Sequence, residues 1–311
     1  MPAFVQSMAK EKVSRIKRTD HREMWEADAL LLKTRLEHRI FGGFPRTSPW
    51  TFEPGTTSEG QDTRRETLTL FPEPGMPVPA VLVRGRALRG PLPTAVIVNP
   101  TGKESALESR QVHGLLSGGW QIVAMDLRAT GATAIRNDVI AGAVGHNSVE
   151  WSNWMGRPLL GQWCWDVIRM LDYLTARDDV EARNIALVSR GAGALVAVCA
   201  GCLDERVHAV ATFGMLASFL TPSPFQGHHM ATMVPFLLDI GDVEHLAALL
   251  APRDLIIAGP VNAKNLPLSD QDSRAAFQFT RRTYGWFQAV RQLRVDAEFP
   301  DELLAEKLHG T

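Results

Sequence analysis

Apolar residues along this chain fall into short runs that alternate with longer segments of helical periodicity. The short runs predict strands at residues 95–99, 121–126, 185–189, 208–213, 255–259 and 293–296. Between them, the clearest helix is predicted at 158–176, where one stripe carries Leu160, Trp163, Val167, Leu171 and Leu174. Strands separated by helices of this length predict the α/β class, with a mostly parallel sheet flanked by helices and connected by right-handed crossovers.

The N-terminal part of the chain follows a helical pattern of its own. Residues 9–41 predict one or two amphipathic helices, since Trp25, Leu30, Leu31 and Leu36 recur at near-helical spacing until two glycines end the pattern. Residues 1–45 are therefore predicted to form a helical arm. The arm offers a surface for self-association or else packs on its own domain, and we favour the second arrangement.

Turn-forming residues separate the arm from the main domain. Pro, Gly, Thr and Ser dominate residues 46–64, which predicts an extended linker. The segments 66–71 and 78–84 then predict an antiparallel strand pair. Residues 65–311 are accordingly predicted to form one large domain.

Composition excludes several classes of partner. The 311 residues are 45% hydrophobic and 22% charged, with a formal net charge of -1, so the chain can bury a large core and has no overall field for nucleic acid or an anionic membrane. It contains neither a signal-peptide pattern in its first residues nor a run of about 18 apolar residues. We therefore expect a cytoplasmic protein that binds neither nucleic acid nor membrane.

The three cysteines favour burial over chemistry. Cys164, Cys199 and Cys202 are an odd set within predicted helices, which argues against a disulfide framework. Cys199 and Cys202 have the spacing of a metal pair, but no second Cys or His pair accompanies them. We expect buried small hydrophobic side chains, and we expect neither a metal nor a cofactor.

Several motifs carry a resemblance to a known family. They are Asp-Leu-Arg-Ala-Thr-Gly at 126–131, Gly-Arg-Pro-Leu-Leu-Gly-Gln at 156–162, Trp-Asp at 165–166, Leu-Asp-Glu-Arg at 203–206 and Ala-Pro-Arg at 251–253. In this order and spacing the chain resembles the α/β-hydrolase superfamily, and within it the acetylxylan-esterase-like branch, over residues 66 to 300. The resemblance implies ester hydrolysis of acetylated sugars or small acyl substrates by a Ser-Asp-His triad.

The chain departs from that triad at each of its three positions. The segment 184–195 has the form of a nucleophile elbow, but Gly191 stands where the family carries its nucleophile. The acid position after the strand at 255–259 is Asn262, and the His position after the last strand is Ala297. His309 is the only His beyond residue 245, and we expect it to be solvated near the terminus. The fold is therefore predicted to persist without the original chemistry.

Polar residues follow the predicted strands at the edge where this fold binds ligands. Thr101, Gly102 and Lys103 follow the strand at 95–99, where the family forms part of its oxyanion hole, and Lys103 could hold a carboxylate or open a helix in solvent. Arg128 follows the next strand, where in relatives it usually braces loops; we retain it as a candidate ligand contact. Arg190, beside Gly191, could clamp an anionic ligand or brace a loop.

Two further segments could cover a pocket. Glu150, Trp151 and Arg157 suit stacking on a sugar ring with polar contacts at its edge, although Trp residues more often pack a loop onto a core. His228 and His229 lie in the excursion after the strand at 208–213, where this fold often carries a lid. Either His could transfer a proton.

Three functions remain open at this point. One is an enzyme repurposed for non-hydrolytic acid/base chemistry (lyase, isomerase or cyclase) on a sugar-derived or small acyl substrate. The second is a catalytically silent pseudo-hydrolase that binds a ligand or a partner. The third is a carboxylic ester hydrolase that uses Ser189 in a shifted elbow. The predicted catalytic residues are Lys103, Glu150, His228 and His229, and the predicted substrate contacts are Thr101, Gly102, Arg128, Trp151, Arg157, Ser189, Arg190, Gly191 and Asn262.

Overall fold

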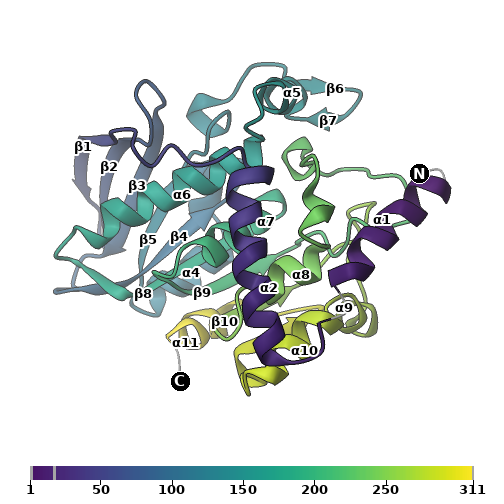
Figure 1. Ribbon diagram of the computed structural model, residues 1–311. Coiled ribbons are helices and arrows are strands. Elements are labelled where there is room, and N and C mark those ends of the chain that lie inside the picture. The colour runs from purple at the N-terminus through teal and green to yellow at the C-terminus, as the bar shows by residue number, and fades with distance from the viewer. Residues whose placement is uncertain (1–2, 17–18, 310–311) are drawn as a thin grey trace.

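The strands assemble into one large sheet at the centre of the molecule (Figure 1). The computed structural model describes residues 3–16 and 19–309, and within them the sheet has nine strands in the order β1-β2-β3-β5-β4-β8-β9-β10-β11. Their bounds are β1 Thr51–Glu59, β2 Thr63–Phe71, β3 Val78–Gly85, β4 Leu92–Val98, β5 Gln121–Met125, β8 Val180–Arg190, β9 Val207–Phe213, β10 Asp254–Ala258 and β11 Leu293–Asp296. A short hairpin of β6 (Val139–Ile140) and β7 (Ala143–Val144) stands apart from it.

Most of the sheet is parallel, as the sequence predicts. The strands β5, β4, β8, β9, β10 and β11 run parallel to one another, and their centres are almost wholly buried because helices cover both faces. The pairs β1–β2, β2–β3 and β3–β5 are antiparallel. The predicted strand pair at 66–71 and 78–84 corresponds to β2 and β3.

The helices form one layer on each face of the sheet. One apolar cluster joins the sheet to α2, α6, α7, α8 and α10, and a second joins it to α3, α4 and α11. The bounds are α1 Ala3–Ile16, α2 Arg22–Arg35, α3 Lys103–Leu107, α4 Arg110–Ser117, α5 His146–Trp154, α6 Leu159–Thr175, α7 Ala192–Leu203, α8 Val243–Ala248, α9 Asp270–Ala276, α10 Gln278–Trp286 and α11 Leu304–Leu308. Short π or 3-10 turns are η1 Leu36–Ile40, η2 Gly131–Thr133, η3 Met230–Thr232, η4 Leu237–Asp239, η5 Val290–Gln292 and η6 Asp301–Leu303.

The N-terminal arm packs on its own domain. Trp25 of α2 is buried, and its ring meets Phe279 of α10 edge-on at a centroid separation of 5.2 Å. The buried stripe continues through Leu32 and Leu36. Leu30 and Leu31 were expected on this stripe, but both are exposed. At about 100° per residue they lie roughly 120–140° around the helix from Trp25, whereas positions seven and eleven residues after it return to the same face.

The predicted linker at 46–64 is extended, and part of it belongs to the sheet. It contains β1, which pairs with β2 along an edge of the sheet. Pro54 and Gly55 are tolerated because an edge strand has one unpaired side, and the register shifts between Pro54 and Thr57. The composition that indicated a linker is thus equally compatible with a bulged edge strand.

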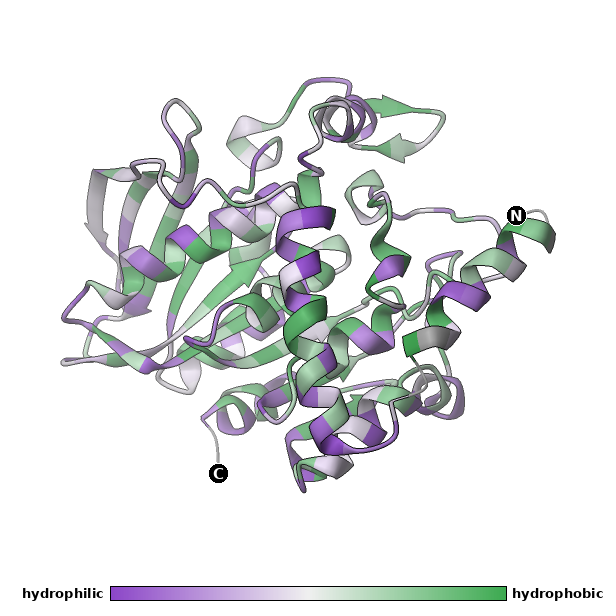
Figure 2. Ribbon diagram, viewed as in Figure 1, coloured by the Kyte–Doolittle hydropathy of each residue, from purple (hydrophilic) through white to green (hydrophobic). Residues whose placement is uncertain are grey.

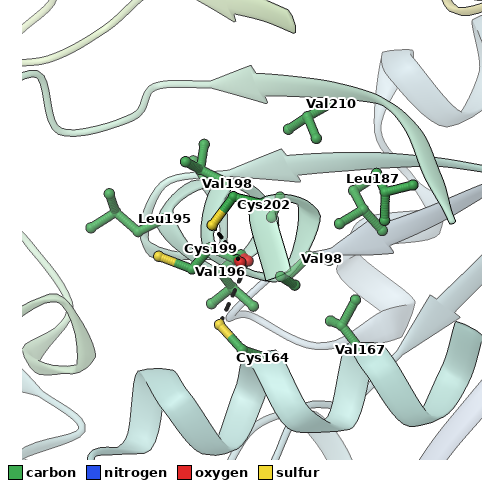
Figure 3. Close-up of a cluster of buried hydrophobic side chains, with 14 of the residues drawn as sticks. Val98, Cys164, Val167, Leu187, Leu195, Val196, Val198, Cys199, Cys202 and Val210 are labelled. Atoms are coloured by element: carbon green, nitrogen blue, oxygen red, sulfur yellow. Dashed lines mark hydrogen bonds between the residues drawn. The ribbon is translucent and has the colours of Figure 1, made fainter. Parts of the chain in front are cut away.

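The three cysteines lie in the apolar core, Cys164 on α6 and the other two on α7 (Figure 3). All three are free and buried, as expected. The Cys202 thiol donates to the carbonyl oxygen of Cys199 on the same helix at 3.1 Å, and Cys164 approaches the carbonyl oxygen of Val196 at 3.7 Å. Burial raises the pKa of Cys202 well above that of a free thiol. These side chains serve as packing groups.

A buried ion network ties the loop after β5 to α6 and to the turn after β2. Nε of Arg128 contacts Oδ1 of Asp166 at 2.8 Å, and its Nη2 contacts Oε1 of Glu73 at 2.7 Å. Arg157 donates to both oxygens of Glu73, at 3.0 and 2.9 Å. Burial raises the pKa of Asp166 to about 6 against the opposing charge of Arg128. Arg128 and Arg157 therefore brace loops, as relatives suggest for Arg128, and neither takes the ligand contact for which it was a candidate.

Replacing Arg128 with Met is expected to lower the free energy of unfolding by about 3–5 kcal/mol, because the fully buried Asp166 carboxylate loses its cation while Glu73 keeps only Arg157. Chemical denaturation near neutral pH measures this loss. Arg157→Met is the matched control: Arg157 is more exposed and contacts Glu73 alone, so its loss is expected to be about 1 kcal/mol or less. Equal losses in the two variants would show that Arg128 is not the centre of the network.

Candidate functional site

A glycine occupies the sharp turn between β8 and α7. Gly191 has φ 57° and ψ -126°, and its N–H donates to the carbonyl oxygen of Phe213 at 2.9 Å. A Cβ at this position would meet no atom within 4 Å. The turn therefore has the backbone of an elbow and open space above it. Two residues on, a Cβ at Gly193 would lie 2.3 Å from the carbonyl oxygen of Val98, so α7 approaches β4 closely only because this residue is Gly.

Two cavities meet over Gly191, one of about 630 Å³ and one of about 610 Å³. Both are lined by Gln111, Arg190, Gly191 and Asp301. The first extends toward α3 and α4, and its further lining is Asn99, Pro100, Thr101, Ser105, Ser109 and Arg110. The second extends over the ends of β9, β10 and β11, and its further lining includes Phe213, Gly259, Asn265, Ala297, Glu298 and Phe299. The volumes are those of small-molecule sites.

The two cavities differ in charge. The charged side chains that line the first cavity are two cations, Arg110 and Arg190, and one carboxylate, Asp301. Glu298 and Asp301 line the second against one cation, Arg190. The first cavity therefore favours an anionic group and the second does not.

Asp301 is held in place by a buried amide. Nε2 of Gln111, at the start of α4, donates to Oδ1 of Asp301 at 2.7 Å, and Gln111 as a residue is only 7% exposed. Sequence reasoning missed both residues because 190 positions separate them. The available signal was local: Gln111 is a polar residue beside the apolar Val112 at a helix start that follows a predicted strand.

The loop after β4 is braced by one carboxylate. Nζ of Lys103 contacts Oδ2 of Asp126 at 2.6 Å, and its backbone N–H donates to Oδ1 at 2.7 Å. Lys103 was predicted to be catalytic, but the buried Asp126 neutralises it and it lines neither cavity. Gly102 supports the same brace with φ 98°. Thr101 does line the first cavity, with its hydroxyl hydrogen-bonded to Oδ1 of Asn99 at 2.8 Å.

The positions expected for the triad acid and base lie at the ends of β10 and β11. The side-chain oxygen of Asn262 accepts from the backbone N–H groups of Lys264 and Leu266, at 2.8 and 3.2 Å. Its amide thus stabilises its own turn and does not line either cavity. Ala297 directly follows β11 and lines the second cavity. It contributes only a methyl group there.

The two histidines of the excursion after β9 are engaged elsewhere. Nε2 of His228 lies 2.9 Å from the carbonyl oxygen of Asn262 and donates to it. Nδ1 of His229 accepts from the backbone N–H of Ala231 at 3.1 Å, and its ring packs on Trp163 at 5.3 Å. Burial lowers the pKa of His229 to about 4, so it is neutral near pH 7. Neither His lines the cavities, which does not support the predicted catalytic roles.

The remaining candidates also lie away from the cavities. Glu150 and Trp151 are on α5, where Glu150 faces His146 of the same helix at 3.7 Å and Trp151 is exposed. The Ser189 hydroxyl is buried in the sheet and donates to the carbonyl oxygen of Ala211 at 3.2 Å. His309 packs against Trp120 at 4.9 Å. Of the predicted site residues, the structure brings together Thr101, Arg190 and Gly191.

Residues 3–16 and 19–309 hold no cluster of three or more His, Cys, Asp or Glu side chains suited to a metal ion. None of their helices is both long and apolar enough to span a bilayer.

Solved esterase structures share this fold. A Bacteroides fragilis protein proposed to be an acetyl xylan esterase superposes with a TM-score of 0.77 at 14% sequence identity, covering 97% of this chain and 88% of that one. A glucuronoyl esterase from Solibacter usitatus gives 0.63 at 16%, covering 86% and 82%. A methylesterase gives 0.69 at 16%, covering 97% and 67%. No protein-family model and no curated protein matches the sequence. The chain therefore has the α/β-hydrolase fold that its motifs implied, with acetyl xylan and glucuronoyl esterases among its structural relatives.

Proposed function

We propose that this chain is an enzyme that binds a sugar-derived carboxylate over Gly191 and transfers a proton with Asp301, without a covalent serine step. The observation that carries the proposal is the Gln111–Asp301 hydrogen bond of 2.7 Å between two residues that, with Gly191 at the vacant nucleophile position, line both cavities. The residues first expected to transfer protons, Lys103, Glu150, His228 and His229, are replaced in this role by Asp301.

The chemistry of the first cavity supports an anionic, polyhydroxylated ligand. Arg110 and Arg190 outnumber the single carboxylate there, and a guanidinium pairs well with a carboxylate. Thr101 and Ser105 add hydroxyl groups that can hydrogen-bond to the hydroxyls of a sugar. The named substrates of two structural relatives, acetyl xylan and glucuronoyl esters, are carbohydrate derivatives, which agrees with this choice.

A positioned carboxylate suits proton abstraction beside a carboxyl group. Gln111 orients one oxygen of Asp301, and the other is available to remove the proton from the carbon adjacent to the ligand's carboxylate. The electron pair left on that carbon spreads onto the carboxylate oxygens, where Arg110 and Arg190 stabilise the charge. Asp301 then holds that proton: its transfer to the hydroxyl leaving the next carbon completes the elimination of water, whereas its return to the same carbon regenerates the ligand and, in heavy water, exchanges that hydrogen.

The surroundings of Gly191 argue against acyl transfer through a serine. Gly191 has no side chain, and Ser189 is 3% exposed with its hydroxyl bound to the sheet. Asn262 and Ala297 supply neither an orienting carboxylate nor a base. The hypothesis of an esterase that uses Ser189 is therefore set aside.

Ester hydrolysis of a different kind is the second candidate. Its support is that structural relatives of this chain are named as esterases. In that case Asp301 would deprotonate a water that attacks the ester carbonyl directly, with no covalent intermediate. This activity would release acetate from an acetylated sugar or methanol from a methyl uronate. A serine-hydrolase probe would not inhibit the release, which identifies hydrolysis without a covalent intermediate.

The wild-type protein is expected to resist fluorophosphonate labelling, since neither a nucleophile nor a base stands at the elbow. Intact-mass measurement after incubation detects any adduct. The variant Gly191→Ser is expected to remain almost inert, because the new hydroxyl has neither a base nor an orienting carboxylate and Asn262 is held in its own turn. Labelling of the wild type at Ser189 would contradict the proposal.

Asp301→Asn is expected to bind glucuronate as well as the wild type does but to lose proton transfer by about 10²- to 10⁴-fold. Proton NMR in heavy water measures this step as exchange of the hydrogen next to the carboxylate. Glu298→Gln, at the other carboxylate of the second cavity, is the matched control and should exchange normally. Arg190→Gln is expected to weaken binding about tenfold.

The outcomes of this experiment separate the candidates. Binding of glucuronate without exchange in the wild type would favour the catalytically silent pseudo-hydrolase. Absence of binding would overturn the assignment of the ligand. Exchange that survives in Asp301→Asn would overturn the role of Asp301.

A further inference from the structure

An apolar groove of about 500 Å³ lies between the N-terminal helix α1 and the excursion that follows β9. Figure 1 shows α1 beside that excursion, and α1 contacts η4 within it. The wall contributed by α1 is one helical face, with positions i, i+3, i+4 and i+7 occupied by Val5, Met8, Ala9 and Lys12. The opposite wall is rich in aromatic side chains: Phe219, Phe225 and Phe236. None of these residues lines the cavities over Gly191.

Both rims of the groove leave large apolar side chains in solvent. Val5 and Met8 are 42% and 48% exposed, and Phe236 on the facing wall is 65% exposed. Figure 2 shows hydrophobic colour at the N-terminal end of α1. The groove floor is closed, since Ala9 and Leu237 are buried. Facing rims that are exposed above a buried floor are typical of a binding groove.

The backbone holds Phe236 at the rim against its own preference. Phe236 has φ 62°, a left-handed conformation that is unfavourable for a bulky side chain. The turn is fixed by the N–H of Asp239, which donates to the carbonyl oxygen of Phe236 at 2.8 Å. A strained, exposed aromatic residue contributes little to folding, and such outliers concentrate at ligand sites.

One end of the groove carries an excess positive charge. Nζ of Lys12 pairs with Asp239, and Nη2 of Arg39 approaches the same carboxylate at 3.5 Å. Two cations thus share a single anion. The Lys12 and Arg39 side chains are both well exposed, so this end can accept one further negative charge.

We infer that this groove binds the apolar chain of a fatty carboxylate, with the carboxylate beside Lys12 and Arg39. The apolar walls match the acyl chain, and the two cations that share Asp239 among the described side chains match a head group with one negative charge. This site is separate from the cavities over Gly191, so the inference stands or falls independently of the proposed enzymatic function.

Calorimetric titration of the 311-residue chain with decanoate tests this assignment. Saturable binding is expected, with decyltrimethylammonium binding about tenfold more weakly or worse because its head group carries the opposite charge. Butyrate, whose chain is too short to fill the groove, is not expected to bind. Absence of saturable decanoate binding, or equal affinity for the two long-chain probes, would overturn the inference.

Variants locate the site. Met8→Glu, which places a carboxylate on the groove wall, is expected to weaken decanoate binding at least about tenfold. Leu30→Glu makes the same kind of change on an exposed position of α2 and should leave binding unchanged. Phe236→Gly should also weaken binding while keeping the fold, since Gly accepts the left-handed turn. Lys12→Met should abolish the preference for decanoate over decyltrimethylammonium.

Circular dichroism establishes that each variant remains folded. Equal decanoate affinity in Met8→Glu and Leu30→Glu would show that the acyl chain of decanoate binds outside the groove. That result would overturn the inference. Sedimentation with phosphatidylglycerol vesicles distinguishes a lipid surface from a single chain: vesicle binding without saturable decanoate binding would overturn the inference and assign the groove to a bilayer.

Discussion

The carboxylate of Asp126 fixes the two loops on which the cavity over Gly191 depends. It accepts hydrogen bonds from the backbone and the ammonium group of Lys103 and from the backbone of Ala132. A Cβ at Gly131 would lie 2.0 Å from its Oδ1, so the second loop can close over it only with Gly. Because a buried carboxylate must be fully hydrogen-bonded, the loops after β4 and β5 have one arrangement. That arrangement sets where α3 begins, and with it Ser105 at the first cavity.

The fold could be predicted from the sequence because short segments of the chain carry the patterns that define its strands and helices. Apolar runs marked β4, β5, β8, β9, β10 and β11, and a single stripe marked α6. Prediction was weaker where tertiary context decides, as with β1, whose Pro54 is acceptable only at a sheet edge. Leu30 and Leu31 show the same limit, since hydrophobicity alone does not state which side of α2 meets α10.

The candidate site was predictable only where a residue's role follows from its neighbours in the chain. Gly191, Arg190 and Thr101 lie at strand ends, and the structure places all three at the cavities. Lys103 and Arg128 also lie at strand ends, but their partners Asp126 and Asp166 neutralise them. Those pairings depend on loop closure, which spacing does not reveal. Asp301 was missed because the amide that orients it comes from α4, 190 residues earlier in the chain.

The floor of the cavity over Gly191 is main chain. Peptide groups at the end of β8 and the start of α7 form it, and Gly193 keeps them pressed against β4. The walls, by contrast, are side chains from α3, α4 and the C-terminal segment. Changes in those side chains can therefore alter which molecules fit without disturbing the packing beneath. The scaffold and its selectivity are encoded by separate parts of the sequence, so ligand preference can diverge while the architecture stays fixed.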